Sequence, residues 1–153
     1  MEKLKEVKNK EEVLKATVEI ISEKLGIGEE DVSILIYNPS KKVLEFVHPP
    51  ELVGAGAIPS TAFDSIAAKV FKSKEGFMFN NFQNVKHLSF FEKLSKRKEP
   101  IKKLIAVPII KGNEALGVIE VSRRDEKNFT QDDLSFMEQM GEMLGEKLME
   151  LIK

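Results

Sequence analysis

The sequence predicts an α+β fold with a central antiparallel sheet of about five or six strands. Two apolar strands, at 104–110 and 116–122, are joined by the turn sequence Lys111-Gly112-Asn113-Glu114, which is typical of a hairpin. A second pair of strands, at 32–37 and 43–48, is separated by a short polar loop. Amphipathic helices are predicted at both ends of the chain, so helices and hairpins are segregated as in the α+β class.

The composition is that of an ordinary globular chain and excludes several kinds of site. A length of 153 residues with 42% hydrophobic content suits a single domain, which we place at 1–153. The 24 basic and 25 acidic residues nearly cancel, so we expect no nucleic-acid or membrane partner. The absence of cysteine excludes disulfides, thiolate catalysis and cysteine–zinc sites. A charged amino terminus and the lack of a long apolar run predict a cytoplasmic protein.

The amino-terminal region, 2–25, is predicted to be helical in two parts. A short helix at 2–8 is followed by Asn9, a residue type that often caps helices, with Glu12 three positions later. Apolar residues then recur at helical spacing. Gly26 is predicted to end this second helix in the left-handed conformation.

The first hairpin alternates between two faces. In its second strand, Leu44, Phe46 and His48 share one face and the residues between them share the other. Two prolines then stop the strand. We expect an irregular loop with two glycines at 54–59.

The middle of the chain is predicted to hold two short helices around one short strand. Ser60 or Thr61 caps a helix over 63–72, a strand follows at 77–79, and a second helix is predicted at 87–94. Most of the ten phenylalanines fall in this part of the chain. They form either a core for the half of the domain that lacks long helices, or the apolar wall of a ligand pocket.

The second hairpin is predicted to lie at the centre of the sheet. Its strands, 104–110 and 116–122, carry apolar residues on both faces, which is typical of strands covered on both sides. We therefore expect 32–37 beside this hairpin and 43–48 further out. The sheet and its inserted middle helices together occupy 32–122.

The last helix is predicted over 130–152. Thr130 and Asp133 have the spacing of a capping box, in which each side chain bonds the backbone amide of the other. Beyond them, apolar residues recur every three or four positions and form one face. This face is expected to pack on the sheet.

Three motifs follow one another in this half of the chain: Val107-Pro108 late in one strand, Gly117-Val118 in the next, and Phe129-Thr130 with Asp133 at the helix start. In this order they resemble the second half of a GAF domain. The resemblance implies terminal helices on one face of the sheet, and short helices and loops that roof a small-molecule pocket on the other. It also implies a sensory role in signal transduction, with an effector domain, fused or separate, as partner.

The same resemblance bears on cofactors and catalysis. Family members that attach bilins, and those that reduce free methionine sulfoxide, work through cysteines, and this chain has none. His48 and His87 are the two histidines, and neither has a carboxylate at zinc-like spacing. We therefore expect no bilin, no haem, no metal and no catalytic residue, and interpret both histidines as surface or hydrogen-bonded groups.

Glu120 is the residue that most strongly suggests a pocket. It lies within a buried strand on the same face as Val118, where a carboxylate must be paired, solvated in a cavity or close to the sheet end. Polar groups at the rim of the phenylalanine cluster would orient a ligand. The predicted ligand-binding residues are Phe46, His48, Phe79, Asn81, Phe90, Val107, Glu120 and Ser122.

The last helix also suggests self-association. Gly141 and Gly145 lie four positions apart and leave a flat groove that another backbone can approach. The groove receives either the first helix of the same chain, near Ala16, or the matching helix of a second chain in a homodimer. The predicted dimer contacts are Phe136, Met140, Met143, Leu144 and Ile152.

The sequence therefore predicts a non-catalytic regulatory domain. It would bind an unidentified small molecule over the sheet and signal through its terminal helices. The alternative is an interaction module that dimerises, with a pocket filled by its own phenylalanines and no ligand.

Overall fold

The computed structural model describes residues 9–54, 56–62, 65–80, 103–123 and 125–152. The predicted helices at 2–8 and 87–94 lie outside these ranges. Within them, no helix combines the length and the apolar character that a membrane span requires. In chain order the elements are α2 (Lys10–Leu25), η1 (Glu29–Asp31), β1 (Val32–Asn38), β2 (Val43–His48), η2 (Pro50–Leu52), β3 (Ala57–Pro59), α3 (Ile66–Ser73), β4 (Phe77–Phe79), β5 (Lys103–Lys111), β6 (Glu114–Arg123) and α5 (Gln131–Ile152).

The described strands form one antiparallel sheet in the order β3-β2-β1-β6-β5-β4. This order confirms that the second hairpin, β5 and β6, is central, with β1 beside β6 and β2 further out. The edge strand β3 is a correction, because an irregular loop was predicted there. Val43 pairs with Pro59 and Glu45 with Ala57. A strand of three residues is too short to show an alternating pattern in the sequence.

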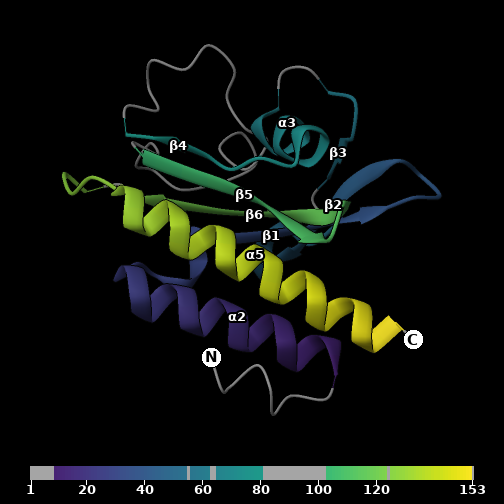
Figure 1. The fold of residues 1–153 in the computed structure, drawn as a ribbon, viewed down its shortest axis with the longest axis horizontal. Helices are drawn as coiled ribbons and strands as arrows, with labels where there is room; N and C mark the ends of the chain where they lie inside the picture. The colour runs from purple at the N-terminus through teal and green to yellow at the C-terminus, as the bar shows by residue number, and fades with distance from the viewer. Residues whose placement is uncertain (1–8, 55, 63–64, 81–102, 124, 153) are drawn as a thin grey trace.

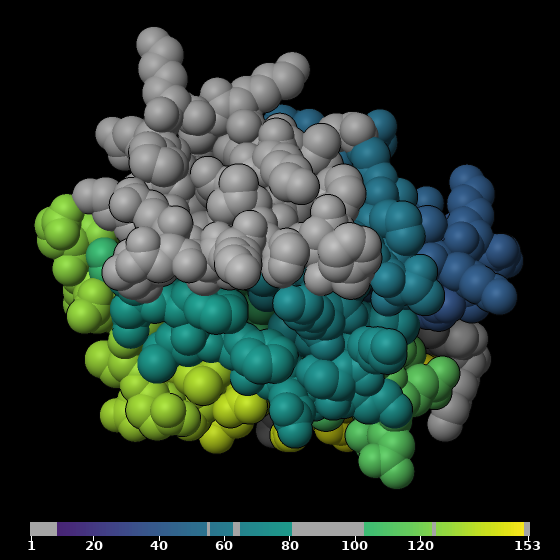
Figure 2. Space-filling model, turned by 90° about the horizontal axis from the view of Figure 1, so that it is seen from above, coloured from purple at the N-terminus to yellow at the C-terminus, as the bar shows by residue number. Residues whose placement is uncertain are grey.

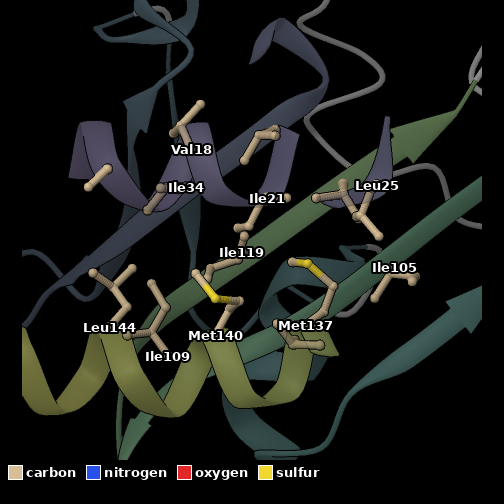
Figure 3. Close-up of a cluster of buried hydrophobic side chains, with 14 of the residues drawn as sticks. Val18, Ile21, Leu25, Ile34, Ile105, Ile109, Ile119, Met137, Met140 and Leu144 are labelled. Atoms are coloured by element: carbon tan, nitrogen blue, oxygen red, sulfur yellow. The ribbon is translucent and has the colours of Figure 1, made fainter. Parts of the chain in front are cut away.

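The two terminal helices cover one face of the sheet. In Figure 1, α2 and α5 lie side by side beneath the strands, and α3 lies on the opposite side. The core on the helix side joins α2, α5 and the odd-numbered residues of β5 and β6 (Figure 3). Its fully buried members include Val13, Ile21, Ile34, Ile105, Val107, Ile109, Ile119, Met137, Met140 and Leu144.

A second core lies on the opposite face, which we call the roofed face. Here α3 packs against β5 and β6. Figure 2 views the molecule from this side, and the teal atoms of α3 and its neighbouring strands make up much of the described surface. The buried members of this core are Leu35, Leu44, Phe46, Leu52, Ile58, Ile66, Ala67, Ala68, Val70, Leu104, Ala106 and Val118.

Helix α3 begins later than predicted. Ser65, rather than Ser60 or Thr61, is its N-cap, and the Ser65 hydroxyl accepts a hydrogen bond from the amide of Ala68 at 3.1 Å. The sequence offers three hydroxyl residues within six positions, and each has the chemistry of a cap. Only Ser65 is followed by buried residues that place the helix against the sheet.

The predicted ends of the long helices are confirmed. Asn9 caps α2, because its side-chain oxygen accepts from the amide of Glu12 at 2.8 Å, and Gly26 follows the helix with φ at 67°. Before α5, the amide of Thr130 donates to the Asp133 carboxylate at 2.9 Å. The amide of Asp133 donates in return to the Thr130 hydroxyl at 3.1 Å.

The glycine groove of α5 is occupied by neither predicted partner. A Cβ atom on Gly141 would overlap the carbonyl oxygen of Pro108, and one on Gly145 would overlap that of Ile110. Both carbonyls belong to β5, so the two glycines let α5 approach the backbone of the central sheet. The proposed contact with α2 near Ala16, or with a second chain, is therefore wrong.

The predicted dimer contacts are also turned inward. Met140 and Leu144 are completely buried in the helix-side core, so they are not dimer contacts. Phe136 and Met143 are partly buried against the same core, and Lys24 of α2 lies over the Phe136 ring at 5.9 Å. The side chain of Ile152 lies outside the described part. Self-association itself stays a prediction.

Candidate functional site

The centre of the roofed face carries a carboxylate. Glu120 of β6 pairs in register with Ser33 of β1 on one side and Ala106 of β5 on the other. Val118, two residues before Glu120, belongs to the roofed core, so alternation directs the Glu120 side chain to the same face. Ser122 follows at the next position on that face. We call Ser33, Glu120 and Ser122 the polar cluster.

All three side chains of the polar cluster are completely buried. Neither carboxylate oxygen of Glu120 has a hydrogen-bond partner in the described structure, and neither hydroxyl oxygen of Ser33 and Ser122 has one. Because burial strips the charged carboxylate of water, the pKa of Glu120 rises from its ordinary value of 4.5 to about 8. At neutral pH Glu120 is therefore mostly protonated, and the polar cluster is uncharged.

The buried basic residues nearby lie on the other face of the sheet. Arg123 and Lys103 form the last cross-strand pair of β6 and β5, one residue out of phase with the polar cluster. Arg123 Nη1 donates to the carbonyl of Leu25 at 2.7 Å, and Lys103 Nζ donates to the carbonyl of Asp125 at 2.9 Å. Arg123 Nε also pairs with the Asp125 carboxylate at 3.2 Å. Among the described residues, neither cation is hydrogen-bonded to Glu120.

Four of the predicted ligand-binding residues lie on the roofed face. Phe46 is buried in its core and Phe79 is packed against that core. Glu120 and Ser122 are the two residues of β6 in the polar cluster. Asn81 and Phe90 lie outside the described residues.

Two predicted ligand-binding residues lie on the wrong face. The register of β1 with β2 shifts between Ile34 and Leu35, so Val47 bulges out and His48 pairs with Ile34 of the helix-side core. His48 Nε2 donates to the carbonyl of Glu29 at 2.8 Å, on the opposite face of the sheet from the polar cluster. Val107 is buried in the helix-side core, because odd-numbered residues of β5 point toward α5.

Ser33 is a member of the cluster that the sequence prediction missed. A single hydroxyl between Val32 and Ile34, in an otherwise apolar run, is a weak signal. It becomes informative only when the register places Ser33 opposite Glu120. The histidine and carboxylate side chains of the described ranges form no group of three or more placed to share a metal ion.

Among the described residues, two cavities lie away from the polar cluster. A mostly apolar one of about 510 Å³ lies at the opposite end of the strands, and a smaller one of about 230 Å³ lies beside α2. Neither contains a buried polar group without a partner, so neither explains why Glu120 is kept in the core. The larger is lined by Lys10, Ile36, Tyr37, Pro39, Glu114, Ala115, Leu116, Leu148 and Leu151, and the smaller by Glu11, Leu14, Lys15, Val18, Glu29, Val47 and His48.

Comparisons with known proteins agree with this architecture. A family model described as GAF domain matches residues 7–147. The GAF domain of a phosphoenolpyruvate-protein phosphotransferase (ptsP) from Coxiella burnetii superposes with a TM-score of 0.79 at 16% identity, over 97% of this chain and 88% of that one. The GAF domain of a two-component sensor histidine kinase from Bacillus halodurans gives 0.66 at 18% identity, over 90% and 95%.

An enzyme also shares the fold. Free methionine-R-sulfoxide reductase from Neisseria meningitidis superposes with a TM-score of 0.68 at 12% identity, over 89% of this chain and 75% of that one. At these identities the likeness shows the fold alone. No curated protein matches the chain by sequence.

Proposed function

Because the chain belongs to the GAF domain family, we propose that it is a non-catalytic regulatory domain that senses a small molecule bound over the sheet. The polar cluster of the roofed face is the observation that carries this proposal. The match to a domain of a sensor histidine kinase is consistent with a regulatory role. The activity of the reductase that shares the fold is not carried over, since this chain has no cysteine.

The energetic cost of the polar cluster supports a ligand site. Each buried polar group without a partner costs about 1–3 kcal/mol relative to a paired one. A valine at these positions would avoid that cost and would suit the strands better. A protein that keeps a less stable arrangement commonly does so for its function, and a bound molecule that supplies the missing hydrogen bonds is a function of this kind.

Contacts of one side chain next to the cluster support signalling through both terminal helices. Arg123 directly follows Ser122, and its guanidinium holds the carbonyl of Leu25 at the end of α2. The same guanidinium lies over the ring of Phe129, 5.5 Å from its centre, just before α5. A ligand that shifts the end of β6 would thus act on α2 and α5 through one side chain.

The edge strand β4 also leads to Phe129, just before α5. The Asn80 side chain, directly after β4, accepts from the amide of Phe129 at 2.8 Å and donates to the carbonyl of Phe129 at 3.0 Å. The ends of β4 and β6 therefore both contact the segment just before α5. This arrangement supports signalling through the terminal helices.

A thermal-shift screen tests the proposal. A ligand at a hundred times its dissociation constant stabilises the folded state by about 2.7 kcal/mol, or about 5–10 °C for a domain of this size. We expect a hit from a library of amines, nucleotides, amino acids, oxoacids and inorganic anions. The hit should be lost in Glu120→Leu and kept in Glu146→Leu, which alters an exposed residue of α5. A hit that survives Glu120→Leu would place the ligand elsewhere.

A further inference from the structure

The chemistry of the polar cluster narrows the class of ligand. Resting on the proposed function above, we propose that the site takes a small molecule with a cationic nitrogen head, an ammonium or a guanidinium group, and that Glu120 is its counter-ion.

The cluster is rich in acceptors and poor in donors. Ionised Glu120 offers two acceptor oxygens, and the hydroxyls of Ser33 and Ser122 each accept as well as donate. Directly paired residues of neighbouring strands have Cβ atoms about 4.5–5.5 Å apart, so Ser33 and Glu120 can bond one nitrogen together. An ammonium or guanidinium group carries only donors and matches this set.

The two strands beside β6 place small residues next to Glu120. Its partners in register, Ser33 and Ala106, have short side chains, whereas the other inward positions of the same face hold larger ones such as Leu35 and Leu104. Phe79 and Val118 lie on the same face and offer apolar contact. The site therefore suits a cationic head on a short apolar body.

An anionic ligand would lack a counter-charge among the described residues. On the strands, Lys103 and Arg123 face the helices and bond backbone carbonyls. On α3, which packs over β5 and β6, Lys69 and Lys72 are exposed. Tyr37 shares the roofed face, but its ring packs at a tilt against Phe71 toward the far end of β1. The side chain of Asn80, the residue that follows β4, is hydrogen-bonded to the backbone of Phe129.

Binding of a cation is coupled to release of a proton. Because the pKa of Glu120 is about 8, the free site is mostly protonated at neutral pH and must ionise before it can pair with a cation. Affinity should therefore rise about tenfold per pH unit up to about pH 8 and level off above it. A neutral ligand would show no such dependence.

Three probes of matched length test the charge requirement: n-butylammonium, n-butanol and butyrate. The full chain, labelled with ¹³C at glutamate carboxyls, is titrated with each by NMR, and proton release is measured by calorimetry in two buffers of different ionisation enthalpy. We expect only n-butylammonium to move the Glu120 signal to its ionised position, with close to one proton released at neutral pH. Glu120→Gln should abolish this response, and Glu146→Gln should retain it.

The outcomes separate this inference from the proposed function. Binding of n-butanol or butyrate that depends on Glu120 would overturn the cationic class and leave the ligand site standing. An absence of any Glu120-dependent response to n-butylammonium, or a Glu120 signal already ionised at neutral pH without a probe, would also overturn it. The thermal-shift screen would then still test the proposed function.

Discussion

Between pH 5 and pH 9 the free energy of unfolding should fall by about 4 kcal/mol through Glu120 alone. The pKa of this carboxyl is about 8 in the folded state and near 4.5 in the unfolded chain. Between these values the folded state binds one more proton than the unfolded state, so stability decreases as pH rises. The stabilising contribution of protonated Glu120 is complete below about pH 4.5 and is lost as pH rises through about 8.

Urea denaturation at a series of pH values measures this effect. The informative quantity is the difference in the free energy of unfolding between the wild type and Glu120→Gln, because this difference isolates the contribution of Glu120. Glutamine has nearly the same shape and cannot ionise, so the variant should lack the decline. Parallel stability curves for the two proteins would mean that Glu120 keeps an ordinary pKa in the fold.

Replacing Gly141 or Gly145 by alanine should destabilise the fold by about 2–3 kcal/mol each, although alanine is the better helix former. The added Cβ would come closer than 3.0 Å to a carbonyl oxygen of β5, and neither backbone can give way cheaply. The helix must then move off the central strand and loosen the helix-side core. The gain in helix propensity, about 1 kcal/mol, offsets only part of this loss.

Chemical denaturation at two protein concentrations distinguishes this account from a dimer contact. The loss of stability should be independent of protein concentration, because both partners belong to one chain. Ser135→Ala, on the exposed side of the same helix, is the control and should change stability by less than about 0.5 kcal/mol. Unchanged folding of Gly141→Ala with weakened self-association would favour a second chain in the groove.

The sheet was predictable because its evidence is local and repeated. Apolar residues of both parities marked β5 and β6 as central, and the spacing of Thr130 and Asp133 marked the start of α5. The same alternation placed Glu120 and Ser122 on the roofed face. Each of these features belongs to a single strand or helix, so the spacing of residues along that element is enough to predict it.

The wrong or missing predictions concern contacts between segments that are distant in the sequence. The bulge at Val47 reverses the face of His48, and a one-residue shift leaves no mark in the sequence of β2. The spacing of Gly141 and Gly145 indicated a close approach, but not that β5 was the approaching backbone. Ser33 joined the cluster only through its register with Glu120. Register and contact partners belong to the tertiary structure, so the residue pattern could not supply them.

The unfolding temperature of Glu120→Leu, measured at pH 7 without ligand, tests the claim that the polar cluster is a ligand site most directly. If Glu120 is retained for binding, leucine removes the energetic cost of burying an unpaired carboxyl. The variant should then be more stable than the wild type by about 3 kcal/mol. If Glu120 instead holds the fold together, the variant should unfold at a lower temperature. That result would contradict the account.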